Sequence, residues 1–174
     1  MSELRDRQGL TEEEFLRRYN PDKYPKPSLT ADIIIVRESG RRPEVLLVRR
    51  GGHPYLGCWA LPGGFSMSSE ALEETAAREL LEETGVEAAD LRLTGVYSKP
   101  GRDPRGWVVS AAYAARVPDA SALAGDDADA VTWAPLDRGA EGLTLDRTGL
   151  GERLAFDHDQ ILSDALRVLF PEGR

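Results

Sequence analysis

Residues 78–86 read R-E-L-L-E-E-T-G-V, and they place Glu79, Glu82 and Glu83 close together in the chain. An α-helix turns about 100° per residue, so Glu83 would lie roughly 40° to one side of Glu79 and Glu82 roughly 60° to the other. All three carboxylates would then project from one narrow face. Like charges at this spacing cost an isolated helix roughly a few tenths of a kcal/mol. The face is therefore either simply solvated or built to hold a cation.

Three features of the same stretch favour a cation. The glutamates stand at the C-terminal end of the expected helix, where the helix dipole disfavours anions. No lysine follows any of them by four positions, although such pairs would stabilise an exposed helix. Gly63 and Gly64 precede the helix, so that backbone can approach a ligand closely. A hard divalent cation such as Mg²⁺, or Mn²⁺ in its place, prefers carboxylate oxygens together with water and phosphate oxygens.

The helix that would carry these glutamates is expected over residues 68–85. Leu72, Ala76 and Leu80 recur four positions apart, which is typical of the packed face of an amphipathic helix. Gly85 stands where a left-handed C-terminal cap belongs. The local pattern thus predicts both the acidic face and the point at which the helix ends.

The other expected elements form a mixed α/β pattern. Thr11 and Glu14 have the spacing of a capping box, which predicts a short helix over 11–19, and the prolines of 20–27 predict an extended arm after it. Apolar runs predict strands, the first two joined as a hairpin, and a closing helix; loops should separate them. The strands are expected at 31–36, 44–50, 91–98, 107–117 and 131–136, the helix at 157–169, and mobile loops at 119–130 and 138–153. This order favours a sandwich of sheet and helices over alternating βαβ units.

The composition limits the function. The chain has 174 residues, which is enough for one compact domain, here expected at 28–174 after an N-terminal helix and arm at 1–27. Its net charge of −8 argues against nucleic-acid binding. The single cysteine excludes an internal disulfide, and no apolar run reaches the length of a membrane span. Without a signal-peptide core, the cytoplasm is the expected location.

From Gly64 onward the sequence follows the pattern G-x5-E-x7-R-E-U-x-E-E-x-G-U, where U is aliphatic, and in this respect it resembles the Nudix box. Every specified position is filled: Gly64, Glu70, Arg78, Glu79, Leu80, Glu82, Glu83, Gly85 and Val86. Further stretches, among them G-C-W-A-L-P-G-G-F and L-A-F-D-H-D-Q-I-L, resemble the ADP-ribose pyrophosphatase-like branch, which also supplies the ligand domain of NrtR-type regulators. One departure is S-M-S-S at 66–69, where many relatives carry an acidic-glycine turn.

The resemblance implies the Nudix fold, an α/β/α sandwich with a mixed sheet and the box as a loop–helix–loop. It also implies metal-dependent hydrolysis of a nucleoside diphosphate linked to another group, above all ADP-ribose, giving AMP and a sugar phosphate. Nucleotide sugars, NADH and oxidised nucleoside triphosphates stay open as substrates. A non-catalytic ADP-ribose sensor is the alternative; the complete carboxylate set argues against it, as does the end of the chain soon after Leu169, where the regulators continue into a winged helix.

Carried onto this chain, the family pattern makes Glu79, Glu82, Glu83 and the carbonyl of Gly63 the expected metal ligands. Arg78 would hold a carboxylate in place as part of the catalytic set. Glu70 would steady the junction between loop and helix, with Gly64 and Gly85 as structural positions of the box.

Substrate contacts are expected from arginines and aromatic residues. Arg102 and Arg105 in the loop P-G-R-D-P-R-G, and Arg49 and Arg50 at the end of a strand, could bind phosphate, or they could be solvated charges of ordinary turns. Phe65, like Trp59 and Trp107, is a candidate for stacking on adenine, although aromatic residues beside strands are more often core. The same weighing assigns Cys58 to packing rather than to a nucleophile pair with His53, and His158 to capping or the core. A homodimer contacted through the arm is a further expectation.

Overall fold

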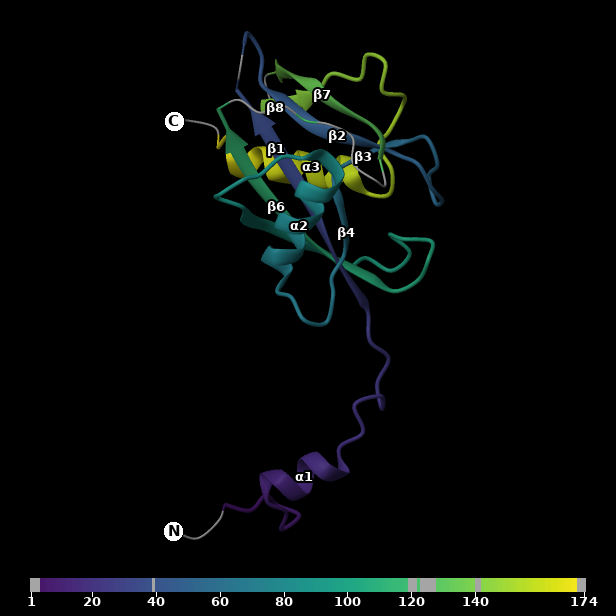
Figure 1. Ribbon diagram of the computed structural model, residues 1–174, viewed down its shortest axis with the longest axis vertical. Coiled ribbons are helices and arrows are strands. Elements are labelled where there is room, and N and C mark those ends of the chain that lie inside the picture. The colour runs from purple at the N-terminus through teal and green to yellow at the C-terminus, as the bar shows by residue number, and fades with distance from the viewer. Residues whose placement is uncertain (1–3, 39, 119–121, 123–127, 140–141, 172–174) are drawn as a thin grey trace.

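The computed structural model describes residues 4–38, 40–118, 122, 128–139 and 142–171. Most of the helices and strands belong to one body, and α1 lies apart from it (Figure 1). Along the chain the elements are α1 (Glu12–Arg18), β1 (Ser28–Arg37), β2 (Glu44–Arg50), β3 (Trp59–Ala60), β4 (Gly63–Phe65), α2 (Leu72–Thr84), β5 (Arg92–Tyr97), β6 (Val108–Val117), β7 (Ala128–Gly139), β8 (Gly142–Leu145) and α3 (His158–Leu169).

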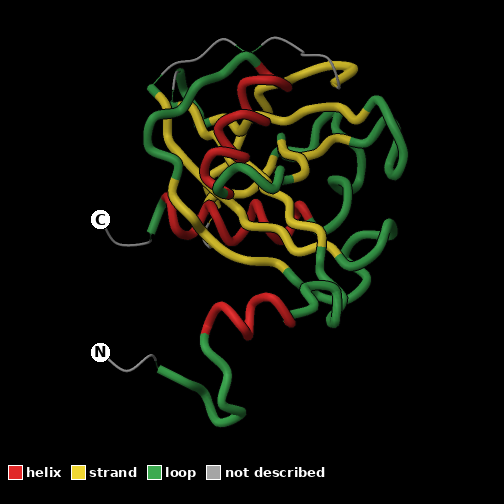
Figure 2. Tube along the Cα trace, turned by 60° about the horizontal axis from the view of Figure 1, so that its bottom comes forward, coloured by secondary structure: helices red, strands yellow, loops and turns green. Residues whose placement is uncertain are grey.

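The strands form a mixed sheet in the order β5-β6-β1-β2-β7-β8, with β3 paired to β2 and β4 to β1. Strand β1 runs parallel to β6, and the other neighbouring strands are antiparallel. Helices α2 and α3 cover opposite faces of this sheet (Figures 1 and 2). The expected α/β/α sandwich around a mixed sheet is therefore confirmed.

Strand β1 runs through the centre of the core and is buried on both faces. Ile33 and Ile35 pack on the side of α2, against Leu80, whereas Ile34 and Val36 pack on the side of α3. Because alternate side chains of a strand point to opposite faces, a continuous apolar run is what a two-sided core requires. The same packing fixes α2 against the sheet and so determines which of its faces stays open to the site.

Helix α1 and the arm at 20–27 extend away from the body (Figures 1 and 2). The predicted capping box is present, since the amide of Glu14 donates to Thr11 Oγ1 over 3.2 Å and the amide of Thr11 donates to Glu14 Oε2 over 2.9 Å. No residue of α1 is buried. The predicted helix at 11–19 and the extended arm are confirmed in outline.

Three strands are present that the sequence pattern did not predict, and two of them, β3 and β4, pair with the strands of the expected hairpin. The expected hairpin of 31–36 with 44–50 pairs only next to its connecting turn, through Val36 with Val45 and Arg37 with Glu44. Farther along, β4 pairs with β1 and β3 pairs with β2. These two strands are too short for a periodic pattern, so only their tertiary pairing makes them strands.

The predicted loops are partly wrong. The segment 138–153 contains the end of β7 and all of β8, which pair with each other at the edge of the sheet. In the other expected loop, 119–130, strand β7 already begins at Ala128, and residues 119–121 and 123–127 lie outside the described residues. Gly139 and Gly142 interrupt the apolar pattern by which a strand is predicted, yet both residues pair in the β7–β8 ladder.

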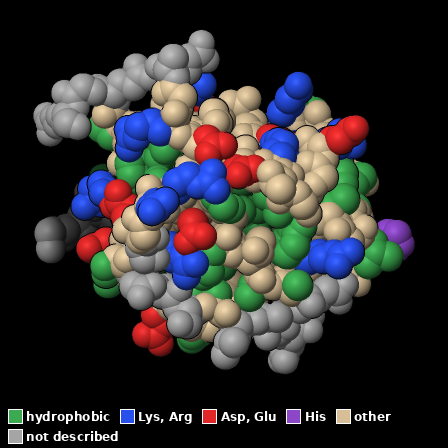
Figure 3. All heavy atoms as spheres, turned by 90° about the horizontal axis from the view of Figure 1, so that it is seen from above, with side chains coloured by type: hydrophobic (Ala, Val, Ile, Leu, Met, Phe, Trp, Pro, Cys, Tyr) green, Lys and Arg blue, Asp and Glu red, His purple; other side chains and the backbone are tan. Residues whose placement is uncertain are grey.

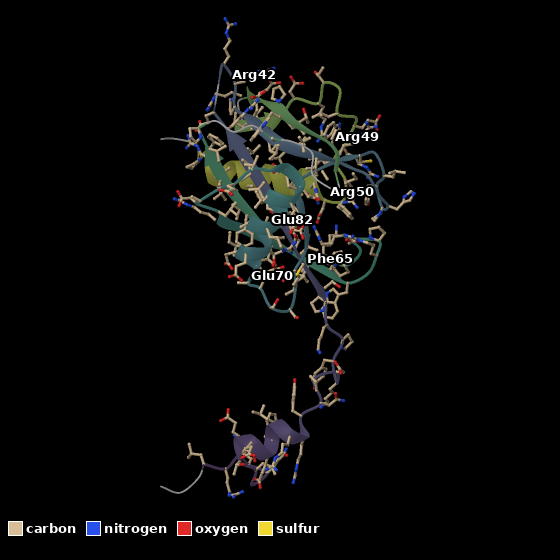
Figure 4. The ribbon with its side chains drawn as sticks, in the orientation of Figure 1. Arg42, Arg49, Arg50, Phe65, Glu70 and Glu82 are labelled. Carbon is tan, nitrogen blue, oxygen red and sulfur yellow. The ribbon has the colours of Figure 1, made fainter. Side chains whose placement is uncertain are left out.

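In the part of the chain that the structure describes, no helix combines the length and the apolar character that a membrane crossing requires. On the face seen in Figure 3, positive and negative side chains are interspersed. Arg42, at the top of the molecule in Figure 4, illustrates this mixing, because its guanidinium pairs with Asp137 at 2.6 Å and with Asp146 at 3.3 Å.

Candidate active site

A cavity of about 600 Å³ lies beside α2, at one end of the sheet. Its walls come from α2, β1, the end of β2, β4, the loop 102–105 and the segment just before α3. In Figure 4, Arg50 lies on β2 at one side of this region, with Glu70 and Phe65 on the other. Carboxylates and guanidinium groups thus meet in one hollow, although the segments that carry them are far apart in sequence.

Helix α2 supplies the acidic wall. Ala76 and Leu80 are fully buried against the sheet, and this turns Glu79 and Glu83, one helical turn apart, toward the cavity. The helix ends at Gly85, whose φ of 67° is the left-handed cap that the sequence predicted.

Glu79 packs against the glycine turn, which is formed by Gly63 and Gly64 where the chain enters β4. A Cβ placed on Gly64 would lie 2.3–2.5 Å from the carboxylate atoms of Glu79, so only glycine leaves room for that side chain. Arg78 donates to Glu79 Oε1 over 2.7 Å. Burial raises the pKa of Glu79, and the ion pair with Arg78 opposes that rise. The charged form of this carboxylate would gain from a further cation in the cavity.

Glu83 is joined to the backbone of the same turn. The amide of Gly63 donates to Glu83 Oε2 over 2.9 Å. Gly63 itself has a φ of 153°, and a Cβ there would lie 2.2 Å from the carbonyl oxygen of Ala31 on β1. The turn therefore requires glycine because β4 lies so close to β1.

Glu82 is placed differently from the other two glutamates. Its side chain is 59% exposed, it accepts from Arg78 over 3.0 Å, and it does not line the cavity. The structure thus brings Glu79, Glu83 and Gly63 together and leaves Glu82 on the outer side of Arg78.

Arg78 links the helix to the preceding loop. Its guanidinium donates to Glu70 over 2.7 and 3.0 Å and to the carbonyl oxygen of Phe65 over 3.1 Å, in addition to Glu79 and Glu82. The hydrogen bonds that Glu70 accepts from Arg78 are the main reason why its pKa is lowered to about 2. Glu70 also accepts from the amide of Met67 over 2.8 Å. Glu70 thus connects the loop before α2 to Arg78 on the helix.

The opposite wall is cationic. Arg50 is half-buried and donates through Nε to the carbonyl oxygen of Pro54 over 2.7 Å. Burial lowers the pKa of Arg50, and the nearby charge of Arg105 lowers it further. Arg105 is held by Asp103, with the shortest N–O distance 2.6 Å, and Arg49 lies at the rim and donates to the carbonyl oxygen of Gly57. Two guanidinium groups that repel each other inside one hollow favour an anionic ligand there.

Arg102 also lines the cavity, but its guanidinium is already paired. The side chain is only 4% exposed, donates to Asp157 over 2.6 and 2.9 Å, and lies 3.5 Å from Asp32. The loop 102–105 is therefore anchored to the start of α3 by this ion pair. Arg102 and Arg105 both direct their forks at protein carboxylates, but Arg102 is buried whereas the side chain of Arg105 is 39% exposed.

We expect Arg102→Met to lower the free energy of unfolding by about 2 kcal/mol, because Asp157 and Asp32 would lose a buried charged partner. Arg49→Met is the matched control; its guanidinium is at the rim, and a loss below about 0.5 kcal/mol is expected. Urea denaturation of both variants measures the difference. Equal losses would contradict the anchoring role of Arg102.

Asp32 is a buried carboxylate inside the apolar run of β1. It accepts from Ser110 Oγ over 2.6 Å, and His158 Nε2 lies 3.4 Å from its Oδ1. The amide of Leu61 donates to His158 Nδ1 over 2.9 Å, so the proton of the neutral imidazole is on Nε2, facing Asp32. His158 is thus a buried residue, as predicted, and it also lines the cavity.

Burial lowers the pKa of His158 below its ordinary value of 6.5. As the pH falls through 6.5 the unfolded chain binds a proton that the folded chain does not, so stability decreases by at most about 1.4 kcal/mol per pH unit until the folded pKa is reached. We expect His158→Gln to remove this part of the slope in urea titrations below pH 6.5. A slope that persists unchanged in His158→Gln would contradict this assignment.

Of the aromatic and thiol side chains that the sequence offered as site candidates, only some lie at the cavity. Phe65 is 42% exposed and lines the cavity. Trp59 packs against the core under α3, and Trp107, 55% exposed, borders a different hollow. Cys58 packs on a small apolar cluster, as expected, while His53 is exposed.

Sequence reasoning missed several residues of the cavity. Asp32, Asp103 and Phe156 all line it. A carboxylate inside the apolar run A-D-I-I-I-V could have indicated Asp32, because a buried charge needs partners. Nothing local marks Phe156, which reaches the site only because the segment before α3 folds back onto β2.

The carboxylates that line the cavity are suited to binding a divalent cation. Among the described residues, no three His, Cys, Asp or Glu side chains gather into a metal-ligand cluster. Mg²⁺, however, is commonly bound by one or two carboxylates and completes its shell with water and substrate phosphate. Glu79 and Glu83, with the backbone of Gly63 between them, provide such a partial set.

The sandwich fold, the glycine turn and the acidic face of α2 together define a Nudix hydrolase. Residues 26–152 match the NUDIX domain, and the chain belongs to this family. Members of the family need a divalent metal ion, and the acidic wall of the cavity is where this chain offers carboxylates for one.

Three relatives are particularly informative. The ADP-ribose pyrophosphatase of Methanocaldococcus jannaschii is 39% identical over 144 residues, which are 83% of this chain and 76% of that protein. The NUDIX domain of Shewanella oneidensis NrtR, solved with ADP-ribose, is 32% identical with a TM-score of 0.79, covering 92% of this chain and 99% of that domain. A bifunctional NMN adenylyltransferase/ADP-ribose pyrophosphatase of Francisella tularensis, solved with AMP and a manganese ion, is 27% identical with a TM-score of 0.70, covering 89% of this chain and 45% of that chain.

Proposed function

We propose that this chain hydrolyses the diphosphate bond of ADP-ribose or a close analogue, giving AMP and a sugar phosphate, with Mg²⁺ as the preferred ion and Mn²⁺ as a substitute. One observation carries the proposal: an acidic wall on α2 and a cationic wall on β2 and the loop 102–105 face the same cavity. A diphosphate ester linked to a nucleoside and a sugar is the kind of ligand that needs both walls.

The residues divide the work between the two walls. Glu79 and Glu83, with the carbonyl of Gly63, would hold the metal, and Arg78 would keep Glu79 in position. When bound, the metal would neutralise the diphosphate and activate water for attack on phosphorus. Arg50 would bind the phosphate oxygens that the metal leaves uncovered.

The relatives support ADP-ribose over the other nucleotides. The Methanocaldococcus protein is an ADP-ribose pyrophosphatase, and the Shewanella domain binds ADP-ribose. The second of these also keeps the sensor alternative open. A cavity that retains Glu79 and Glu83 beside the glycine turn favours catalysis, because a pure sensor has no use for an activated water.

The test is a substrate panel with the purified chain and either Mg²⁺ or Mn²⁺. ADP-ribose, NADH, a UDP-sugar and 8-oxo-dGTP are compared by chromatography of the released nucleotides. We expect release of AMP from ADP-ribose to be fastest and to stop with EDTA. Binding of ADP-ribose without turnover of any member would favour the sensor, and faster turnover of another member would replace ADP-ribose as the substrate.

The remaining expectations stay predictions from the sequence: a homodimer contacted through the arm at 20–27, the absence of a nucleic-acid partner, and a cytoplasmic location. The division of the chain into an arm at 1–27 and a single domain at 28–174 is likewise a proposal.

A further inference from the structure

Two aromatic residues beside the cavity have an unusual backbone. Tyr55 has a φ of 62° and Phe156 a φ of 53°, and among the described residues these are the non-glycine positions with positive φ. Bulky residues rarely adopt this conformation, and when they do the surrounding structure must hold them there. The two rings contact each other, with centroids 4.7 Å apart. The fold therefore maintains this aromatic pair at a conformational cost.

Phe156 is surrounded by flat and charged groups rather than by aliphatic side chains alone. The guanidinium of Arg50 lies 5.0 Å from its ring centroid and that of Arg105 lies 5.5 Å away. Arg105 also lies 4.7 Å from the ring centroid of Phe65 on β4. One planar cation is thus shared by two rings that come from segments far apart in the sequence. Aromatic faces and guanidinium planes of this kind are the surfaces on which nucleobases stack.

This aromatic group adjoins the acidic wall. Phe65 follows Gly63 by two residues on β4, so its ring stands next to the turn that contacts Glu79 and Glu83. Phe65, Phe156 and Arg105 all line the same cavity as those carboxylates. A nucleotide whose phosphates are held between Arg50 and a metal ion at the acidic wall would therefore place its base near the rings.

We propose that Phe156 and Phe65, together with the Arg105 guanidinium, form the nucleobase subsite of this cavity, and that Phe156 is its main stacking surface. The inference rests on the proposed function, and it assigns the adenine end of the substrate. The sugar-phosphate end would then lie away from the rings.

Calorimetric titration with AMP and, separately, with ribose 5-phosphate tests the subsite in the presence of Mg²⁺. Phe156→Leu keeps an apolar side chain but lacks a π face, and we expect it to weaken AMP binding about tenfold, as loss of one stacking contact does. Ribose 5-phosphate binding should change less than about twofold. Phe156→Tyr, which keeps the ring, should bind AMP within about twofold of the unaltered chain.

Phe65→Leu, on a separate element, should cause the same selective loss and keeps the test decisive if Phe156→Leu does not fold. Trp107→Leu is the matched control, since Trp107 is exposed but borders the other hollow. Equal weakening of both ligands, or no weakening of AMP in either phenylalanine variant, would overturn the subsite. Hydrolysis of ADP-ribose with such a result would leave the proposed function standing. If the substitutions weaken AMP binding selectively but the chain hydrolyses no nucleotide, the subsite stands and the proposed function is contradicted.

Discussion

Glu83→Gln is expected to lower kcat about a thousandfold, equivalent to about 4 kcal/mol of transition-state stabilisation, with little change in folding stability. Glu83 lines the cavity and accepts a 2.9 Å hydrogen bond from the amide of Gly63. Glutamine has the same size and can still accept that bond, but it lacks the negative charge with which a divalent ion would interact. The effect should therefore appear in catalysis and in metal binding rather than in the fold.

Glu82→Gln provides the matched control for this prediction. The two residues are adjacent on one helix, but the side chain of Glu82 is 59% exposed and outside the cavity. We expect its kcat to fall less than about tenfold, since only its bond to Arg78 changes. Steady-state AMP release from ADP-ribose and calorimetric uptake of Mn²⁺ are the two measurements. A similar loss of kcat in both variants would refute the separation of Glu82 from the metal site.

Gly64→Ala is expected to lower kcat at least about a hundredfold while the chain stays folded, because a displacement of about 1 Å in a catalytic group has effects of this size. The added Cβ would lie 2.3–2.5 Å from the carboxylate of Glu79, and that flexible side chain is what must move. Glu79 would then leave its place beside Arg78 and the cavity. The backbone of Gly64 is not left-handed, so alanine adds no conformational strain there.

Gly63→Ala distinguishes loss of the site from loss of the fold. Its Cβ would lie 2.2 Å from the carbonyl oxygen of Ala31 and 3.0 Å from Cα of Asp32, so the obstacle is the backbone of β1. We expect this variant to lower the thermal unfolding temperature as well as activity, whereas Gly64→Ala should shift the unfolding temperature by only a few degrees at most. Thermal unfolding by circular dichroism, beside the activity assay, checks both. Full activity in Gly64→Ala would show that Glu79 tolerates displacement.

Much of the site could be predicted from the sequence because it depends on one helix. Glu79 and Glu83 share a face through the period of an α-helix, and Gly85 caps that helix through its left-handed backbone. The junction between loop and helix is equally local, since Glu70 reaches Arg78 within the same short segment. Such features follow from spacing, and the family resemblance adds the chemistry that the spacing serves.

The cationic and aromatic part of the site could not be predicted in this way. Arg102 looked like a phosphate ligand, yet its partner Asp157 lies 55 positions along the chain. Phe156 and Phe65 share the guanidinium of Arg105 although the rings belong to distant segments. Strand β8 is a strand only because it pairs with β7.

By itself the sequence determined the family, the helix with its acidic face and the glycine turn before it, because each depends on neighbours within a few residues. Only the tertiary structure decided that Glu83 faces the cavity while Glu82 does not, that Arg102 is held by Asp157, and that an aromatic group adjoins the carboxylates. These outcomes depend on how α2 packs on the sheet and where the loops fold back. No local spacing contains that information, because such contacts join residues whose distance along the chain is unrelated to their distance in space.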